Sequence, residues 1–195
     1  MKTTRQEIGG LGNLLFKEAY IWGQFRDGNI PDIYVQSPKY WLKYKDEIRN
    51  RFGSGIGYID KVALHIRRGD YLKVSQFHTN LWDMDYYKEA VKLFPNEKFL
   101  VFCKDNQSEA QDQNDQEWCQ DNLPFLGIDF ELYKHGEETN DLNAMASCKA
   151  IIGDNSSFSW FAAFLGGKKA IFPKEEKWFV DGQKRTELLP EWVKL

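Results

Sequence analysis

The chain has 195 residues, of which 42% are hydrophobic and 28% charged, so it can form one globular domain or two small lobes around a cleft. Its formal net charge of -3 gives no basic excess for counterion release, which argues against a general nucleic-acid-binding protein. Three widely spaced cysteines, Cys103, Cys119 and Cys148, indicate reduced core thiols in a reducing compartment. No stretch resembles a secretory leader or an integral membrane segment, so we expect a cytoplasmic protein.

The N-terminal part of the chain predicts mostly helix. A glycine-rich turn at 9–13 precedes apolar residues at helical spacing, Leu15, Ala19 and Trp22, and therefore predicts that a helix begins there. The glycines lack the G-x-G-x-x-G spacing and the preceding strand of a dinucleotide-binding fingerprint, which disfavours a Rossmann dehydrogenase. A second, amphipathic helix is predicted over 40–52.

From residue 61 onward, short apolar strands alternate with helices. Strands are predicted at 61–66, 99–102, 129–133, 150–152 and 170–172, and helices at 85–94, 141–148 and 156–165. The polar stretch 106–116 is interpreted as a solvated loop or the extended start of a helix. This alternation predicts an α/β fold with a parallel, doubly wound sheet.

The most informative motif is His65-Ile66-Arg67-Arg68-Gly69-Asp70-Tyr71, directly after the first predicted strand. Open α/β sheets bind ligands at the carboxyl ends of their strands. Two adjacent guanidinium groups there favour a phosphorylated ligand, because arginine binds oxyanions in bidentate fashion. The alternative interpretation is a surface basic pair beside an aspartate that caps a helix.

A second motif, Asp154-Asn155-Ser156-Ser157-Phe158-Ser159-Trp160, follows the predicted strand 150–152 and begins an apolar helix. Serine hydroxyls and backbone N–H groups at a helix N-terminus form an anion site that the helix dipole strengthens. Ordinary N-capping by serine or asparagine is the alternative. Because a parallel sheet brings both motifs to the same edge, we expect the two anion sites to converge on a diphosphate.

Together the two motifs resemble the first and third motifs of the α1,2-fucosyltransferases, glycosyltransferase family 11, which belong to a wider group with α1,6- and protein O-fucosyltransferases. Four further segments match that family: Gly9-Gly10-Leu11-Gly12-Asn13, Glu117-Trp118-Cys119, Cys148-Lys149 and Lys177-Trp178-Phe179. The resemblance implies a two-lobed GT-B-like fold whose C-terminal, Rossmann-like lobe binds the donor GDP-β-L-fucose. It also implies transfer that inverts the anomeric centre and needs neither a metal nor another cofactor.

The resemblance implies roles for individual residues. Arg67 would hold the β-phosphate with the N–H groups and hydroxyls near Ser157, and His65 would lie against the nucleoside. Asp141 would recognise guanine, although a helix N-cap is its alternative role, and Asp105 is a weaker candidate for a ribose or guanine contact. The other residues expected in the donor site are Arg68, Asn155, Ser156, Phe158, Gly10, Gly12 and Asn13.

Attack by an acceptor hydroxyl on the anomeric carbon benefits from a general base, for which Asp70 is the first candidate and His78 the second. Asp70 has an alternative role in an ion pair with Arg68, and a loose, oxocarbenium-like route needs little help from a base. Asp83-Met84-Asp85 is a D-x-D sequence of the kind that can bind a metal. Both carboxylates stand where a helix start would be capped, so we expect no metal ligands.

Only 64 residues precede His65, fewer than in the family, so we expect a shortened member. Its reduced N-terminal, acceptor-side lobe would span 1–60 and its donor-binding lobe 61–195. The predicted activity is transfer of L-fucose from GDP-β-L-fucose to a glycan acceptor, at O-2 of galactose. Two alternatives stay open: a non-catalytic relative that binds nucleotide sugars or glycans, and a transferase that uses another donor sugar. The sequence leaves the oligomeric state open. Four tryptophans are candidates for stacking on sugar rings: Trp41, Trp82, Trp178 and Trp192.

Overall fold

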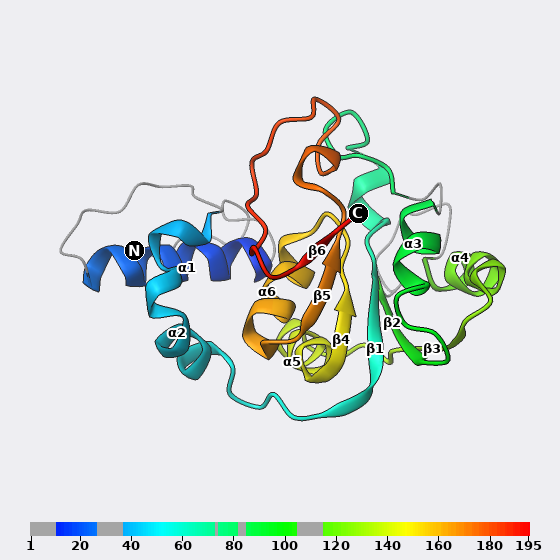
Figure 1. Ribbon diagram of the computed structural model, residues 1–195, viewed down its shortest axis with the longest axis horizontal. Coiled ribbons are helices and arrows are strands. Elements are labelled where there is room, and N and C mark those ends of the chain that lie inside the picture. Colours follow the sequence, from blue (N-terminus) through cyan, green and yellow to red (C-terminus); the bar gives the residue numbers. More distant parts are fainter. Residues whose placement is uncertain (1–10, 27–36, 73, 82–84, 105–114) are drawn as a thin grey trace.

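The centre of the fold is a parallel sheet. The computed structural model describes residues 11–26, 37–72, 74–81, 85–104 and 115–195. The strands are β1 (Ile59–Ile66), β2 (Lys98–Cys103), β3 (Asp129–Leu132), β4 (Cys148–Ile152), β5 (Lys169–Phe172) and β6 (Val193–Lys194). They pair in parallel in the order β3-β2-β1-β4-β5-β6 (Figure 1). The predicted α/β class with a parallel, doubly wound sheet is confirmed.

Helices cover both faces of the sheet. One face carries α1 (Leu11–Arg26), α2 (Lys45–Phe52), α5 (Glu138–Ser147) and α6 (Ser157–Gly166), and the other carries α3 (Asp85–Val91) and α4 (Asp115–Asn122) (Figure 1). Short 3₁₀ helices lie in the connections: η2 (Pro38–Tyr40), η3 (Leu42–Tyr44), η4 (Gly69–Leu72), η5 (Leu123–Leu126) and η6 (Glu175–Lys177). Within the described ranges, no helix combines the length and apolar character needed to cross a membrane.

Alternation along the strands sorts side chains into two cores, one on each face of the sheet. In β1, Val62, Leu64 and Ile66 pack in the core beneath α3 and α4, whereas Ala63 packs in the core beneath α6. The same alternation turns His65 toward the α6 face. The strand pattern therefore decides which side chains of the following motif can reach the same ligand.

The core on the α6 face is rich in aromatic rings. Phe16 of α1 lies 4.5 Å from Trp160 and 4.7 Å from Phe161 of α6, between ring centroids. Trp41 lies 5.0 Å from Phe164, also of α6. Elements within 1–60 therefore share one core with α6, and the proposed boundary between two lobes at residue 60 stays a prediction.

The structure differs from the sequence prediction in the helix predicted over 40–52 and at the last strand. The helix predicted over 40–52 is interrupted, because Trp41 adopts a non-helical backbone (φ -138°, ψ -3°) that accompanies its burial against α6. The short edge strand β6 was not predicted, since two residues are too few to show a periodicity. Residues 106–114 of the predicted polar stretch lie outside the described residues, and its last two residues, 115 and 116, begin α4.

The start of α1 meets the start of α6 at Gly12. A Cβ atom at this position would lie 2.4 Å from the carbonyl carbon of Ser157 and 2.5 Å from the backbone nitrogen of Phe158. Real Cβ atoms do not approach backbone that closely, so the absence of a side chain at Gly12 allows the two helix starts to touch. This contact places the N-terminus of α1 beside that of α6.

We therefore expect Gly12→Ala to lower the free energy of unfolding by about 1–3 kcal/mol, the usual cost of forcing an extra methyl into a packed contact. The clash of the new methyl group with the backbone of Ser157 and Phe158 destabilises the fold. The higher helix propensity of alanine, worth about 1 kcal/mol, offsets only part of this loss. Urea unfolding of both proteins measures the difference. Gly57→Ala is the matched control, because no other atom lies within 4 Å of a Cβ at that position. Equal or higher stability of Gly12→Ala would contradict the close contact.

Candidate functional site

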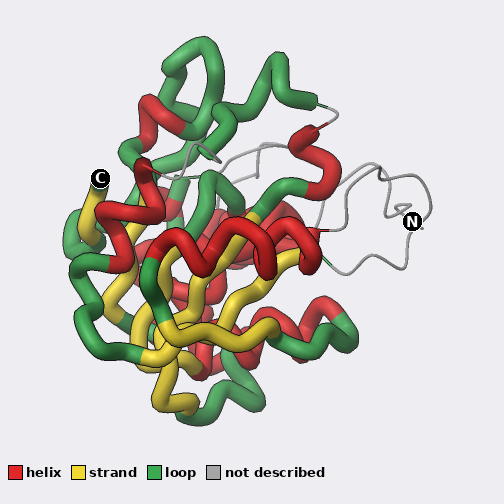
Figure 2. The backbone as a smooth tube through the Cα atoms, turned by 90° about the vertical axis from the view of Figure 1, so that its right-hand side faces the viewer, coloured by secondary structure: helices red, strands yellow, loops and turns green. Residues whose placement is uncertain are grey.

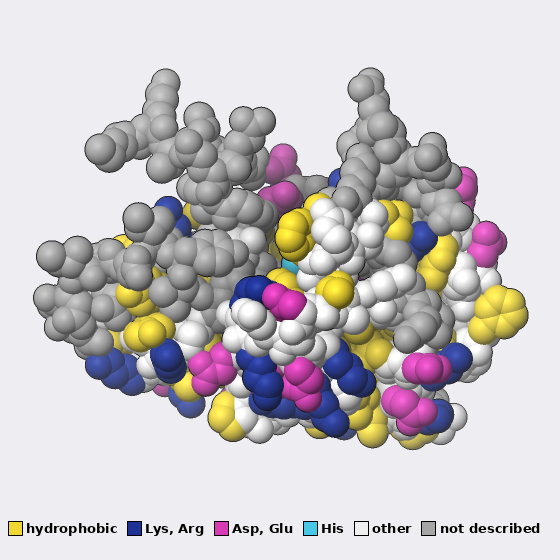
Figure 3. Space-filling view, turned by 90° about the horizontal axis from the view of Figure 1, so that it is seen from above, with side chains coloured by type: hydrophobic (Ala, Val, Ile, Leu, Met, Phe, Trp, Pro, Cys, Tyr) yellow, Lys and Arg dark blue, Asp and Glu magenta, His cyan; other side chains and the backbone are white. Residues whose placement is uncertain are grey.

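The two sequence motifs meet at the carboxyl ends of β1 and β4, which are neighbours in the middle of the sheet. The chain continues from β1 to β2 on one side and from β4 to β5 on the other, so a crevice opens between the two loops. Loops gather at this end of the sheet (Figure 2), and a histidine is visible near the middle of this face (Figure 3). A cavity of about 830 Å³ lies here, within the range of about 300–1,000 Å³ found for small-molecule sites.

A buried carboxylate, that of Asp154, joins the two loops. Its Oδ2 atom accepts hydrogen bonds from the backbone N–H of Arg67 and from the hydroxyl of Tyr87, both at 2.7 Å. Its Oδ1 atom accepts the backbone N–H of Asn155 at 2.6 Å. Burial raises the pKa of Asp154 to about 6, although these three hydrogen bonds and the Arg67 charge oppose the shift. The carboxylate thus fixes the backbone of the first motif against that of the second.

The side chain of Arg67 and the first turn of α6 line the same cavity, as the sequence predicted. Ser156 is the N-cap of α6, and its hydroxyl accepts the backbone N–H of Phe158 at 3.3 Å. Ser157 is the first residue of this ten-residue helix. A guanidinium group beside the positive end of a helix dipole can hold an anion, most simply a phosphate.

A neutral histidine lies next to this anion site. His65 is 6% exposed, and its ring packs against that of Phe158 at 5.9 Å. Burial, and then the charge of Arg67, lower its pKa to about 3, so the imidazole is uncharged at neutral pH. Its Nδ1 atom is buried and has no hydrogen-bond partner in the part of the chain that the structure describes. A flat, neutral ring of this kind suits contact with a nucleoside.

A second histidine in the cavity lining, His135, differs from His65 in being positively charged. Its Nδ1 atom lies 2.9 Å from Oδ2 of Asp141. A hydrogen bond to the Cys103 sulfur, and then the Asp141 carboxylate, raise the pKa of His135 to about 9, so the ring is protonated at neutral pH. The other oxygen of Asp141 accepts the backbone N–H of Gly136 at 3.0 Å. Asp141 therefore orients His135, and its expected contact with guanine stays a prediction.

Arg68 departs from the sequence expectation of two guanidinium groups on one ligand. Its side chain is 4% exposed, lies 3.6 Å from Asp115, and stacks over the ring of Trp118 at 4.4 Å. Consecutive residues leaving a strand point to opposite faces, so Arg67 turns toward α6 while Arg68 turns toward α4. Arg68 is not among the described residues that line the cavity, and its expected contact with the donor stays a prediction.

The structure brings most of the other predicted donor-site residues together. Those that line the cavity are Gly12, Asn13, His65, Arg67, Asp141, Asn155, Ser156, Ser157 and Phe158. His78, the second candidate base, also lines it. Gly10, Asp105 and the side chain of Asp70 lie outside the described residues. The amide of Asn155 has a structural role, because its Nδ2 atom donates to the carbonyl oxygens of Thr79 and Trp178, both at 3.0 Å.

Several lining residues were not singled out from the sequence. Tyr71 and Phe179 stood inside matched motifs without an assigned role, whereas His135 carried no signal at all. The other lining residues without a sequence assignment include Phe102, Cys103, Lys104, Gly136, Glu138 and Thr186. Among the described residues, no group of three or more His, Cys, Asp or Glu side chains could hold a metal ion. Asp85 begins α3 and pairs with Lys88 at 3.2 Å, while Asp83 lies outside the described residues.

Fold and cavity define a doubly wound α/β protein with a cavity, lined by Arg67 and the N-terminus of α6, where its strand order reverses. The profile of glycosyl transferase family 11 matches residues 33–195, so the chain belongs to that family.

Relatives among curated proteins are enzymes of glycan synthesis by name. The O-antigen biosynthesis glycosyltransferase WbnK of Escherichia coli is 29% identical over 142 residues, 68% of this chain and 44% of that protein. An alpha-1,2-colitosyltransferase of Escherichia coli is 27% identical over 68% of this chain and 49% of its own length. Galactoside alpha-(1,2)-fucosyltransferase 1 of Bos taurus is 28% identical over 68% of this chain and 38% of its own length. The chain thus spans half or less of the length of these relatives.

A solved structure, POFUT1 in complex with GDP, gives a TM-score of 0.42 at 16% identity, covering 69% of this chain and 48% of that chain. This similarity is too distant to decide either fold or ligand.

Asp154→Asn should change how stability depends on pH. The folded carboxyl has a pKa of about 6 against an ordinary value of 3.8, so the folded state keeps its proton to higher pH than the unfolded state. Ionisation of this carboxyl therefore lowers the free energy of unfolding of the wild-type protein by roughly 3 kcal/mol as the pH rises from 3.8 to about 6. In the Asp154→Asn variant this decrease in stability is absent. Urea unfolding of both proteins between pH 3.8 and about 6 measures the difference.

Asp181→Asn is the control for this experiment. Asp181 is an exposed carboxyl whose pKa is lowered by Arg185, so its removal acts on the pH dependence with the opposite sign. Parallel stability curves for the wild type and Asp154→Asn would contradict the raised pKa of Asp154.

Proposed function

We propose that this chain is the donor-binding part of an inverting, metal-independent fucosyltransferase. It transfers L-fucose from GDP-β-L-fucose to a sugar hydroxyl of a glycan, O-2 of a galactose. Membership of glycosyl transferase family 11 supports glycosyl transfer, and the name of the bovine relative supports this donor sugar and linkage. The observation that carries the proposal is the meeting of Arg67 with the start of α6 in one cavity.

The chemistry requires such a site. The acceptor oxygen forms a bond to the anomeric carbon while the bond from that carbon to the β-phosphate oxygen breaks, and GDP leaves with the electron pair. Negative charge therefore develops on the β-phosphate, where a preorganised guanidinium and helix N-terminus stabilise it without a divalent cation. The acceptor proton passes to a base, for which Asp70 and then His78 remain our candidates.

Two other functions fit the same pocket. A relative of similar identity is named an alpha-1,2-colitosyltransferase, which favours a different donor sugar as one alternative, because phosphate and guanine contacts do not select the hexose. The other alternative is a non-catalytic relative that binds a nucleotide sugar or a glycan without turnover. Both alternatives keep the phosphate site.

Incubation with GDP-fucose and lactose tests the activity, with mass spectrometry of the products. We expect fucosylated lactose and free GDP in equal amounts, and an unchanged rate after treatment with a chelator, because Arg67 and α6 neutralise the leaving group. GDP binding without any product would favour the non-catalytic alternative. Loss of activity on chelation, restored by manganese, would refute metal independence and return Asp83 and Asp85 as candidate ligands.

Arg67→Ala tests the phosphate site independently of turnover. Removing a charged hydrogen-bond donor costs about 1.5–3 kcal/mol, so GDP affinity should fall roughly tenfold to more than a hundredfold. Calorimetric titration with GDP measures it. Arg51→Ala is the matched control, since Arg51 is an exposed arginine that stacks on Trp22 outside the cavity. Unchanged GDP affinity in Arg67→Ala would refute the assigned role.

A further inference from the structure

An aromatic wall lines one end of the cavity. It consists of Tyr71, His78 and Phe179, which all belong to the cavity lining. The rings of Tyr71 and His78 stack at 4.0 Å with an interplanar angle of 15°, and His78 lies 5.2 Å from Phe179. The guanidinium of Arg67 lies 5.5 Å from the centre of the Tyr71 ring. The wall thus begins at the phosphate-binding arginine and leads away from it ring by ring.

Two segments of the chain, around His78 and around Phe179, pair as a short antiparallel ribbon that holds the wall. His78 and Phe179 form an antiparallel bridge, flanked by hydrogen bonds from Thr79 N–H to the Trp178 carbonyl at 3.2 Å and from Val180 N–H to the Phe77 carbonyl at 3.0 Å. Side chains alternate across such a ribbon, so the pair opposite each other shares one face and its neighbours share the other. His78 and Phe179 accordingly face the cavity. Phe77 and Val180, on the other face, are 62% and 59% exposed.

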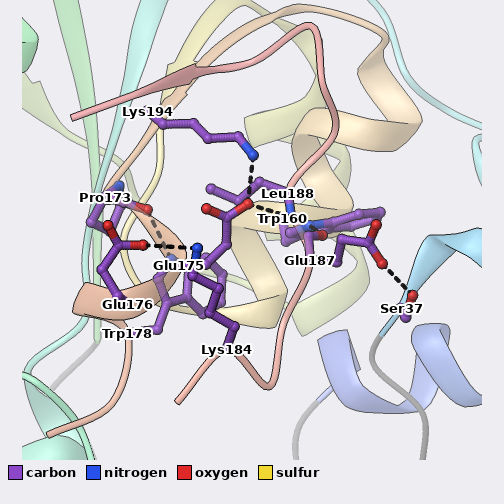
Figure 4. Close-up of polar contacts among 10 residues, drawn as sticks. All are labelled: Ser37, Trp160, Pro173, Glu175, Glu176, Trp178, Lys184, Glu187, Leu188 and Lys194. Atoms are coloured by element: carbon purple, nitrogen blue, oxygen red, sulfur yellow. Dashed lines mark hydrogen bonds and ion pairs between the residues drawn. The ribbon is translucent and has the colours of Figure 1, made fainter. Parts of the chain in front are cut away.

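The segment after β5 is held firmly against the rest of the fold (Figure 4). Glu175 pairs with Lys194 of β6 at 2.5 Å, and the indole N–H of Trp178 donates to the carbonyl oxygen of Pro173 at 3.0 Å. Further along, the indole N–H of Trp160 donates to the carbonyl oxygen of Glu187 at 2.9 Å. Together with the amide of Asn155, these bonds set the ribbon in place before any ligand arrives.

The order of the strands in the sheet determines the order in which the lining residues lie along the cavity. His135 follows β3, and Cys103 is the last residue of β2. Arg67 follows the central strand β1, and Phe179 follows β5 on the far side of β4. The wall therefore lies across the phosphate site from His135 and Asp141. A donor whose nucleoside lies toward β2 and β3, with its phosphate at Arg67, presents its sugar toward the wall.

We propose that the wall of Tyr71, His78 and Phe179 is the subsite that receives the acceptor, and that it takes the apolar ring face of a neutral hexose at the end of a glycan. This inference rests on the proposed function, because it uses the direction in which GDP-fucose would lie. Hexose rings present C–H groups on one face, and aromatic side chains offer rigid contact area for such a face. Tyr71 and His78 stack on each other and Arg185 lies 4.8 Å from the centre of the Phe179 ring, so the hexose contacts the part of the wall that these groups leave uncovered. Continuity with the phosphate site in a single cavity favours the acceptor as the occupant over an unrelated ligand.

Of the four tryptophans suggested by the sequence, the three that the structure describes are buried. Trp41, Trp178 and Trp192 are 0%, 2% and 6% exposed and belong to the core on the α6 face, while Trp82 lies outside the described residues. The half-buried Phe179 takes the place that the sequence analysis gave to tryptophan.

Phe179→Ala tests the subsite, with Phe77→Ala as a matched control on the opposite face of the same ribbon. Binding of GDP is measured by calorimetry, and contact of lactose with the GDP-loaded protein by saturation-transfer NMR and titration. We expect Phe179→Ala to weaken lactose binding roughly tenfold with GDP affinity unchanged. Phe77→Ala should leave both unchanged, and Phe179→Tyr should restore lactose binding. Thermal melting checks that every variant is folded.

The outcomes separate the two proposals. Equal lactose binding by the wild type and Phe179→Ala, or GDP binding by the wild type without any lactose contact, would overturn the acceptor subsite alone. Failure of the wild type to bind GDP would instead refute the proposed function and this inference with it. Loss of GDP affinity in Phe179→Ala would place the ring in the donor site and also overturn the assignment.

Discussion

Asp154 lies between β1 and β4, where the strand order of the sheet reverses. Its carboxylate accepts hydrogen bonds from backbone N–H groups of the loop after β1 and of the loop after β4. An unpaired carboxylate in this position would be costly, because 1% exposure leaves almost no water to solvate it. Three donors compensate for the burial, and in doing so they fix Arg67 relative to the first turn of α6. The geometry of the proposed phosphate site thus depends on a side chain that is not among the described residues lining the cavity.

Much of the fold could be predicted, because apolar runs and helical spacing follow directly from burial. The runs at 61–66 and 99–102 mark strands buried on both faces, and they match β1 and β2 closely. Both anion-binding motifs follow central strands, so the parallel sheet alone brings Arg67 and Ser157 to one edge. The break at Trp41 could not be predicted, since it depends on a pocket among aromatic rings of α6 that are distant in sequence.

The candidate site was predictable where chemistry follows directly after a strand, and less so elsewhere. Strand alternation was available in the sequence and already separates Arg67 from Arg68, yet the buried partner Asp115 could be identified only from the structure. His135 acquires its charge from groups on β2 and α5, which no local pattern reveals. The aromatic wall depends on pairing between residues about 100 positions apart, His78 with Phe179, and such pairing leaves no periodic trace.

The aromatic packing of α1 and Trp41 on α6 bears on how this protein can be shortened. A fragment that starts at residue 61 would lose only the first two residues of β1 from the sheet, but it would uncover Trp160, Phe161 and Phe164, which the intact chain buries completely. Large rings uncovered side by side favour self-association, so such a truncation would be prone to precipitate even with its sheet intact. Anyone trimming the chain for crystallisation or display would need polar replacements on that face of α6, or would have to retain α1.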